Sequence, residues 1–144
     1  DFCWTFIGPD KDFVQRFTDP AGHGVGKGFS TQLTRSLMQN KKFREKFIRR
    51  AAELLNTIYT PENVLAKIEE CASVIYDEVG RPGGDAERWP EGGGFGNWKA
   101  CVKGMRNFAR QRRNYMIDHI QNYFGLSNAQ VREIFGEKDA VELE

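Results

Sequence analysis

The amino-acid sequence predicts a mainly α-helical protein, with about five helices after one short N-terminal strand. Three observations lead to this fold class. Apolar residues recur three or four positions apart through most of the chain, which is the spacing of one face of an α-helix. Residues that favour helix starts precede several of these stretches. Glycine-rich stretches separate some of them, and such stretches do not continue a helix at low cost.

The first six residues, DFCWTF, are the one segment that is typical of a β-strand, since they are short and aromatic. Gly8-Pro9-Asp10 breaks this segment. Because a single strand is not stable in water, we expect it to pair with a part of the protein outside this sequence. The apolar pattern is irregular from residue 11 to 28, which includes Asp19-Pro20 and a glycine-rich run, and we expect a loop there.

Helical periodicity begins after this loop. Ser30 is suited to cap a first helix, on which Leu33 and Leu37 lie one turn apart. Asn40 can cap a second helix, and an apolar stripe follows it. The stripe consists of Phe43, Phe47, Ala51, Leu54 and Ile58.

Thr60-Pro61-Glu62 is a strong start signal for a third helix. The threonine can cap the helix, proline suits the first helical position, and the helix dipole favours an acid in the first turn. The apolar stripe then runs to Gly80, where we expect the helix to end. Its members are Leu65, Ile68, Ala72, Ile75 and Val79.

A long loop is predicted from residue 80 to 96, because its glycines and Pro82 interrupt the helical pattern. Trp89 lies within it, and we expect this large apolar side chain to pin the loop to the body of the domain. A long fourth helix follows, with Asn97 as its cap and Gly125 as a left-handed stop. Its apolar stripe consists of Val102, Met105, Phe108, Met116, Ile120 and Tyr123.

A short fifth helix begins with the clearest local signature of the chain, a capping box between Ser127 and Gln130. We interpret residues 1–136 as a single helical domain and residues 137–144 as a frayed acidic tail. The closing dipeptide Leu143-Glu144 is typical of a cloning site before a purification tag, and we expect it to carry no fold information.

Composition and charge exclude several classes of protein. The sequence is 40% hydrophobic and 28% charged, which is ordinary for a globular domain and not for a disordered chain. The formal net charge is only +1, so no overall field favours nucleic acid or acidic lipid. The sequence contains no apolar run of the ~18 residues that a membrane-spanning helix needs.

Cysteines and histidines do not form a predicted site. Cys3, Cys71 and Cys101 are widely spaced, without the C-x-x-C or Cys/His spacing of a zinc site. Cys71 and Cys101 fall on apolar helical faces, where we expect small buried side chains. His23 lies in a glycine-rich stretch, and we expect His119 to be a hydrogen-bonded packing residue beside Tyr115 and Tyr123 on the long helix.

Two loops contain candidate ligand-binding residues. The stretch from residue 22 to 28 resembles a phosphate-binding loop, but Ala21 replaces the first glycine of the Walker motif and Gly28 replaces its hydroxyl residue. These two departures disfavour phosphate-loop chemistry in this stretch. Asp10 and Asp12 are spaced so that they could hold a cation, although solvated loop acids are commoner.

Two basic stretches could bind phosphate or nucleic acid. We favour solvated helix faces, with some arginines bridging to acids of the third helix, because aromatic residues are not interleaved with the basic ones. The acids in question are Glu62, Glu69 and Glu70. The basic residues are Lys41, Lys42, Arg44, Lys46, Arg49 and Arg50 in the first stretch, and Lys99, Lys103, Arg106, Arg110, Arg112 and Arg113 in the second.

The order of these pieces from residue 1 to 126 resembles the distal part of the CotH kinase family, whose fold is an atypical kinase-like one. The opening DFCWTF is similar to that family's D-x-D-W-T-F-G strand and turn. LMQNKKFREKF, residues 37–47, is similar to its L-x-x-N-x-x-F-R-x-x-F helix. AELLN, YTPE, Arg88-Trp89, Trp98 and Phe108-Ala109-x-x-Arg112 complete the series in order.

The resemblance implies that this chain is the C-terminal helical lobe of a CotH-like protein kinase. Asp1 matches the first acid of the motif, which in the family is thought to hold the magnesium that accompanies ATP. The remaining catalytic elements would precede Asp1, so the chain alone is expected to hold no catalytic residue, no cofactor-binding residue and no Mg-ATP. The implied partners are that preceding part of the domain and a protein substrate or coat protein, in a bacterial cell-surface, secreted or spore-coat setting.

The sequence departs from the family motif at two positions. Cys3 stands where the second acid belongs, and a thiol is not a hard oxygen ligand for magnesium. Ile7 stands where the closing glycine belongs, and Gly8 comes one residue later. These departures favour the alternative that the protein is a degenerate kinase-like scaffold or surface-binding module without phosphotransfer activity.

Overall fold

The computed structural model describes residues 8–22, 27–89 and 94–144. The regular secondary structure of these residues consists of helices only, and the mainly α prediction is confirmed. The elements are α1 (Phe13–Thr18), the 3-10 helix η1 (Lys27–Thr31), α2 (Gln32–Gln39), α3 (Lys41–Thr57), α4 (Pro61–Gly80), α5 (Asp85–Arg88), α6 (Gly94–Phe124) and α7 (Asn128–Phe135). The strand predicted for residues 1–6 lies outside the described residues.

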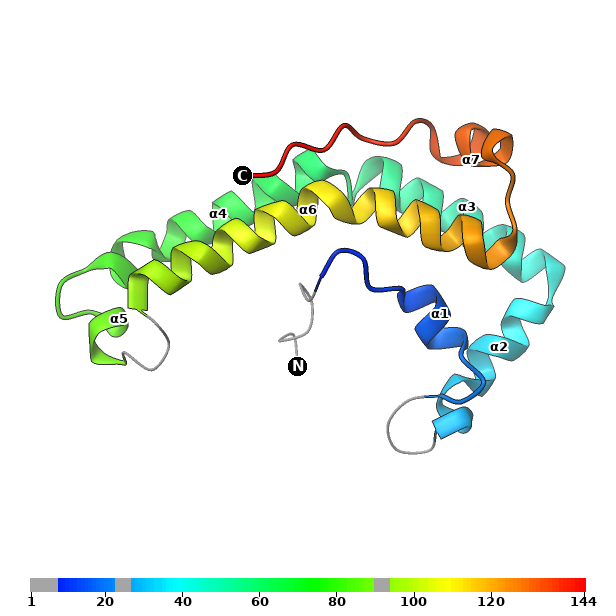
Figure 1. Ribbon diagram of the computed structural model, residues 1–144, viewed down its shortest axis with the longest axis horizontal. Helices are drawn as coiled ribbons and strands as arrows, with labels where there is room; N and C mark the ends of the chain where they lie inside the picture. The colour runs from blue at the N-terminus through cyan, green and yellow to red at the C-terminus, as the bar shows by residue number, and fades with distance from the viewer. Residues whose placement is uncertain (1–7, 23–26, 90–93) are drawn as a thin grey trace.

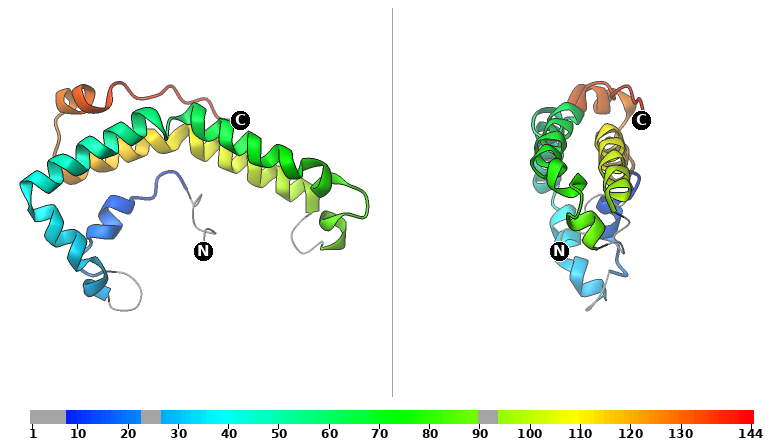
Figure 2. Two further views of the ribbon diagram at one scale, coloured as in Figure 1. Left: turned by 180° about the vertical axis from the view of Figure 1, so that it is seen from behind. Right: turned by 90° about the vertical axis from the view of Figure 1, so that its left-hand side faces the viewer.

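A long helical hairpin forms the body of the molecule (Figure 1). Helices α3 and α4 follow one another as one arm, and the 31-residue α6 returns beside both of them. Helices α1 and α2 curve away on one side of this hairpin, while α7 and the C-terminal tail lie on the opposite side (Figures 1 and 2). The hairpin therefore has two different faces, one towards α1 and one towards α7.

Two apolar clusters hold the hairpin together. The first joins α1, α3, α6 and α7, and its central side chains, Ile117, Ile120 and Phe135, are at most 1% exposed. The second joins α4 to the N-terminal half of α6 through Ile68, Val102 and Ala109. A small alanine at position 109 lets the two helices approach closely. The arms are thus fixed to each other at both ends of the hairpin.

Most predicted helix ends are confirmed by capping contacts. Asn40 and Thr60 accept hydrogen bonds from the backbone N–H groups of Phe43 and Asn63. Gly125 has the left-handed φ of 65° that ends α6. The capping box at Ser127 is formed in both directions, since the backbone N–H of Gln130 donates to the serine Oγ and the glutamine Oε1 accepts from the Ser127 N–H.

Two helix starts were predicted wrongly. Ser30 lies inside η1, and α2 begins after Thr31. The Thr31 side chain makes no capping bond to α2; its Oγ1 donates to the Asp19 carbonyl at 2.7 Å and accepts from Arg35 Nε. Asn97 lies inside α6, which begins at Gly94. On α2 the predicted apolar pair faces solvent, with Leu33 72% exposed, and Met38 is buried instead.

The predicted loops contain short helices that carry too few residues to show a period. Residues 13–18, expected in a loop, form α1, where Asp12 accepts from the Gln15 N–H at 2.8 Å and Val14 is buried in the first apolar cluster. Residues 85–88 form α5 within the predicted loop from 80 to 96. Trp89 does not pin that loop, since it is 63% exposed. Cys71 and Cys101 are exposed as well.

The C-terminal tail is not frayed, because Arg113 of α6 holds it. This arginine is only 7% exposed, and its guanidinium donates to the Phe135 and Leu55 carbonyls at 2.8 and 3.2 Å. The same group contacts Asp139 at 3.2 Å. Further along the tail, Glu144 pairs with Arg110 at 2.6 Å. Arg113 therefore joins α3, α6, α7 and the tail.

Replacing Arg113 by methionine should lower the free energy of unfolding by about 3 kcal/mol, because buried carbonyl oxygens and Asp139 would lose their donor. Urea denaturation followed by circular dichroism measures this change. Arg49→Met, at an exposed position of α3, is the matched control and should change stability by less than ~0.5 kcal/mol. Equal unfolding midpoints for the two variants would contradict the role given to Arg113.

Candidate functional site

The turn at residues 8–12 follows the aspartate-containing segment directly and is attached to the middle of α6. The Arg112 Nη1 atom donates to the Pro9 carbonyl at 2.6 Å and to the Lys11 carbonyl at 2.8 Å. Because these partners are about a hundred residues apart in sequence, the contact can be made only in the folded chain. Arg112 was predicted only as part of a basic stretch and of the pattern Phe108-Ala109-x-x-Arg112, neither of which indicates its partners.

Aromatic rings and acids surround the Arg112 guanidinium. Its central carbon lies 5.4 Å from the Phe13 ring centroid and 5.8 Å from that of Phe108, which is the range of a cation–π contact. Burial lowers the pKa of Arg112, while the charges of Asp12 and Asp10 act in the opposite direction. Because arginine still remains protonated, it supplies a fixed positive charge beside the turn.

Asp12 joins this turn to α1 and approaches His119 of α6. Its Oδ1 atom caps α1 and lies 3.9 Å from the His119 Nδ1 atom, which is too long for a hydrogen bond. His119 packs against the Tyr115 ring, with ring centroids 6.2 Å apart, and is 8% exposed. This burial confirms the packing role of His119, while its Nδ1 atom has no hydrogen-bond partner among the described residues.

Of the acids predicted as candidate cation ligands, Asp10 and Asp12 are among the described residues and Asp1 is not. Asp10 and Asp12 lie within the electrostatic reach of Arg112, which competes with a metal ion for their charge. The described part of the chain contains no group of three or more His, Cys, Asp or Glu side chains that could hold a metal. Asp1, Cys3 and Ile7 lie outside the described residues, and the assignment of Asp1 as a magnesium ligand stays a prediction.

The glycine-rich loop is fixed to α2 at its C-terminal end. Arg35 Nη2 donates to the Gly28 carbonyl at 2.9 Å, and an ideal Cβ on Gly28 would lie 2.6 Å from the Pro20 carbonyl oxygen. Only glycine fits this position, so Gly28 has a packing reason to be there. Residues 23–26, including His23, lie outside the described residues.

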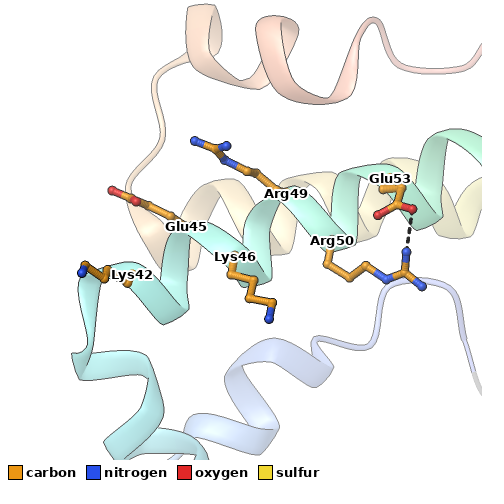
Figure 3. A pocket seen from close by; sticks show the side chains of 6 residues that line it. All are labelled: Lys42, Glu45, Lys46, Arg49, Arg50 and Glu53. Carbon is orange, nitrogen blue, oxygen red and sulfur yellow. Dashed lines mark ion pairs between the residues drawn. The ribbon is translucent and has the colours of Figure 1, made fainter.

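The basic face of α3 is exposed and partly paired within its own helix (Figure 3). Arg50 pairs with Glu53 at 2.6 Å, whereas Lys46 and Arg49 extend to different sides of the helix. The side chains line a shallow hollow on one helix surface and do not converge on a common point. This arrangement favours the interpretation of a solvated face.

Three arginines of the basic stretch on α6, Arg106, Arg110 and Arg113, pair with acids. Arg106 binds Glu69 of α4 through two hydrogen bonds, one of them 2.8 Å long, as predicted for the third helix. The bond from Arg106 lowers the pKa of Glu69. Glu70 pairs instead with Lys67 of its own helix. The paired acids neutralise positive charge that would otherwise be available to a phosphate-bearing ligand.

An apolar groove of about 940 Å³ lies between the two arms of the hairpin, next to Arg112. One wall comes from the end of α3 and from α4, and the other comes from α6 between Met105 and Met116. Ile58 and Tyr59 on the first wall are both 55% exposed. The sequence pattern did not indicate this groove, since its residues belong to the stripes that were expected to be covered.

A family model matches most of the chain. The family model described as CotH kinase protein matches residues 5–116, and the chain belongs to this family. The matched range begins after Asp1 and Cys3, and it contains the turn at residues 8–12 and Arg112. The comparison with curated proteins gives no match, and neither does the comparison with solved structures. Among the described helices, none is both long and apolar enough to cross a membrane.

Arg112→Ala should release the turn at residues 8–12 and loosen α1, because the Pro9 and Lys11 carbonyls lose their donor and Phe13 loses its cation. We expect backbone amide exchange in residues 10–18 to become at least about tenfold faster, equivalent to ~1.4 kcal/mol of local stability. Hydrogen-exchange mass spectrometry measures it. Arg110→Ala, which removes a contact to the tail, is the control. Similar amide exchange of residues 10–18 in both variants would refute this role of Arg112.

Glu69→Gln should lower the free energy of unfolding by less than ~1 kcal/mol at neutral pH, since its pair with Arg106 is largely exposed. The folded-state pKa of Glu69 is lowered, so this stabilisation is present above the ordinary carboxyl pKa and is lost as the pH falls through the lowered value. The difference in Tm from the unmodified chain should therefore shrink below about pH 4. Glu70→Gln is the control, and a difference that grows on acidification would contradict the assignment.

Proposed function

We propose that this chain is the C-terminal helical lobe of a CotH-like atypical protein kinase, and that it is not catalytically complete alone. Membership of the CotH kinase family supports the kinase-related class. The observation that carries the proposal further is the double hydrogen bond from Arg112 to Pro9 and Lys11. It fixes the chain a few residues after Asp1, at the point where a metal-binding acid of a kinase needs a rigid support.

In this proposal Asp1 binds the magnesium ion that accompanies ATP. Kinases hold this ion with an acid that follows a core strand, and the ion neutralises charge that develops on the transferred phosphoryl group. Asp1 would supply a hard carboxylate oxygen of the kind that magnesium prefers. The part of the domain that precedes Asp1 would supply the lysine, the phosphate-covering loop and the catalytic acid, and the phosphate acceptor would be a protein in a bacterial cell-surface, secreted or spore-coat setting.

The alternative is a degenerate kinase-like scaffold that binds a surface or coat protein without phosphotransfer. Cys3 favours this alternative, because a thiol replaces the second acid of the family motif and is a poor magnesium ligand. The helical hairpin is compatible with both functions, since its packing does not require an active site.

Isothermal titration with Mg-ATP distinguishes the two functions, in a protein that contains this chain and the preceding part of the kinase-like domain. Asp1→Ala should weaken Mg-ATP binding by at least about tenfold, or ~1.4 kcal/mol. Asp10→Ala is the matched control, since Asp10 lies after the motif and its charge acts on Arg112. Absent Mg-ATP binding in the folded unmodified protein would favour the scaffold, and equal weakening by both variants would remove Asp1 as the metal ligand.

A further inference from the structure

A stripe of basic side chains runs along one face of α6. Its members recur every three or four residues, so they lie on successive turns of the same helix face. They are Lys99, Lys103, Arg106, Arg110 and Arg113. The stripe covers about four helical turns, and positive charge concentrated in this way attracts an acidic ligand.

The C-terminal tail, which runs back along the hairpin, lies on one half of this stripe (Figure 1). Asp139 contacts Arg113 at 3.2 Å, and Glu144 pairs with Arg110 at 2.6 Å. The Arg106 Nη1 atom lies 3.8 Å from the same glutamate carboxylate. The tail is not helical between these two acids. The chain itself thus shows that a non-helical acidic segment fits along the stripe.

The other half of the stripe borders a groove of about 550 Å³ between α4 and α6, which we call the tail-side groove. Glu144 is part of its lining, so the groove adjoins the end of the tail. Its apolar surface comes from Val102 and from the rings of Tyr76 and Trp98, whose centroids are 5.7 Å apart. An apolar side chain of a bound segment would be covered by these rings.

The two walls of the tail-side groove carry opposite charges. The α4 wall contributes the acids Glu69 and Asp77, whereas the α6 wall contributes Lys99, Lys103 and Arg106. Glu69 already binds Arg106, but Lys103 is exposed and makes no ion pair among the residues that the structure describes. A carboxylate in the groove is therefore attracted to the α6 wall and repelled by the α4 wall.

We propose that the tail-side groove binds an acidic segment of a partner protein, with carboxylates on Lys103 and Arg106 and an apolar side chain against Trp98. Charge complementarity favours this occupant, since the acidic tail already lies on the adjoining half of the stripe. A partner that extends to Arg110 displaces Glu144, whose exposed pair is easily exchanged.

This site goes beyond the proposed kinase function and does not depend on it. The groove lies on the face of the hairpin that carries the tail, whereas Arg112 and the turn at residues 8–12 lie on the face towards α1 (Figure 1). A failure of Mg-ATP binding would therefore leave the groove proposal standing, and the reverse also holds.

Fluorescence anisotropy tests the proposal on the 144-residue chain, with a fluorescein-labelled peptide of three Glu-Glu-Leu repeats as the probe. The peptide should bind, and added salt should raise its Kd because exposed charges are screened. Lys103→Glu should weaken binding by about fivefold or more, since it places a like charge beside the peptide carboxylates. Lys46→Glu, the same charge change on the exposed face of α3, should alter the Kd by less than about twofold.

Two results would overturn the proposal. One is the absence of binding to the folded chain at low salt. The other is equal weakening by Lys103→Glu and Lys46→Glu, which would show attraction to the overall charge of the protein and not to the groove. Circular dichroism checks that both variants are folded, as expected for exposed positions.

Replacing the tail carboxylate tests whether the probe also uses the arginines under the tail. Glu144→Gln should tighten peptide binding by about twofold to threefold, because Arg106 and Arg110 lose a competing acid. Glu142→Gln removes the same charge from an exposed tail side chain that makes no ion pair within the described part of the chain, and should leave the Kd unchanged. Equal effects of the two substitutions would contradict the placement of the peptide along the stripe.

Discussion

The burial of α6 on several sides is the constraint on which the rest of the structure depends. A helix in a protein owes most of its stability to the packing of its apolar surface against other elements, and α6 has 31 residues to cover. Helix α4 covers its N-terminal half around Val102 and Ala109, and α1, α3 and α7 surround its C-terminal half around Ile117 and Ile120. Among the described elements outside the hairpin, α1, α5 and α7 pack on α6, whereas α2 packs on α3 and α1.

Two adjacent arginines on α6 connect this core to the ends of the chain. Arg112 binds carbonyls of the turn at residues 8–12, and Arg113 binds carbonyls of α3 and α7 and the side chain of Asp139. Both sites need several donors in one plane, which a guanidinium has and an ammonium lacks. Because the two residues are neighbours, one short part of α6 positions both the N-terminal turn and the C-terminal tail.

These contacts give the family pattern a physical reason. Within Phe108-Ala109-x-x-Arg112, Phe108 packs against the guanidinium, Ala109 permits the close approach of α4, and Arg112 binds the turn. A helical lobe built in this way holds the segment after the aspartate-containing motif at a fixed place. Holding this segment in place is what such a lobe can contribute to a kinase-like site, whether the site transfers phosphate or only binds a ligand.

The sequence by itself determined the mainly α fold class, the course of α3 and α4, and the helix ends at Asn40, Thr60, Gly125 and Ser127. These features depend on side chains that act within one turn of their own backbone, so the local pattern is sufficient. Only the tertiary structure decided the formation of α1, the exposure of Trp89, Cys71 and Cys101, and the attachment of the tail. The groove between the arms and the partners of Arg112 and Arg113 also depend on residues distant in sequence. Local hydrophobic periodicity does not indicate such contacts.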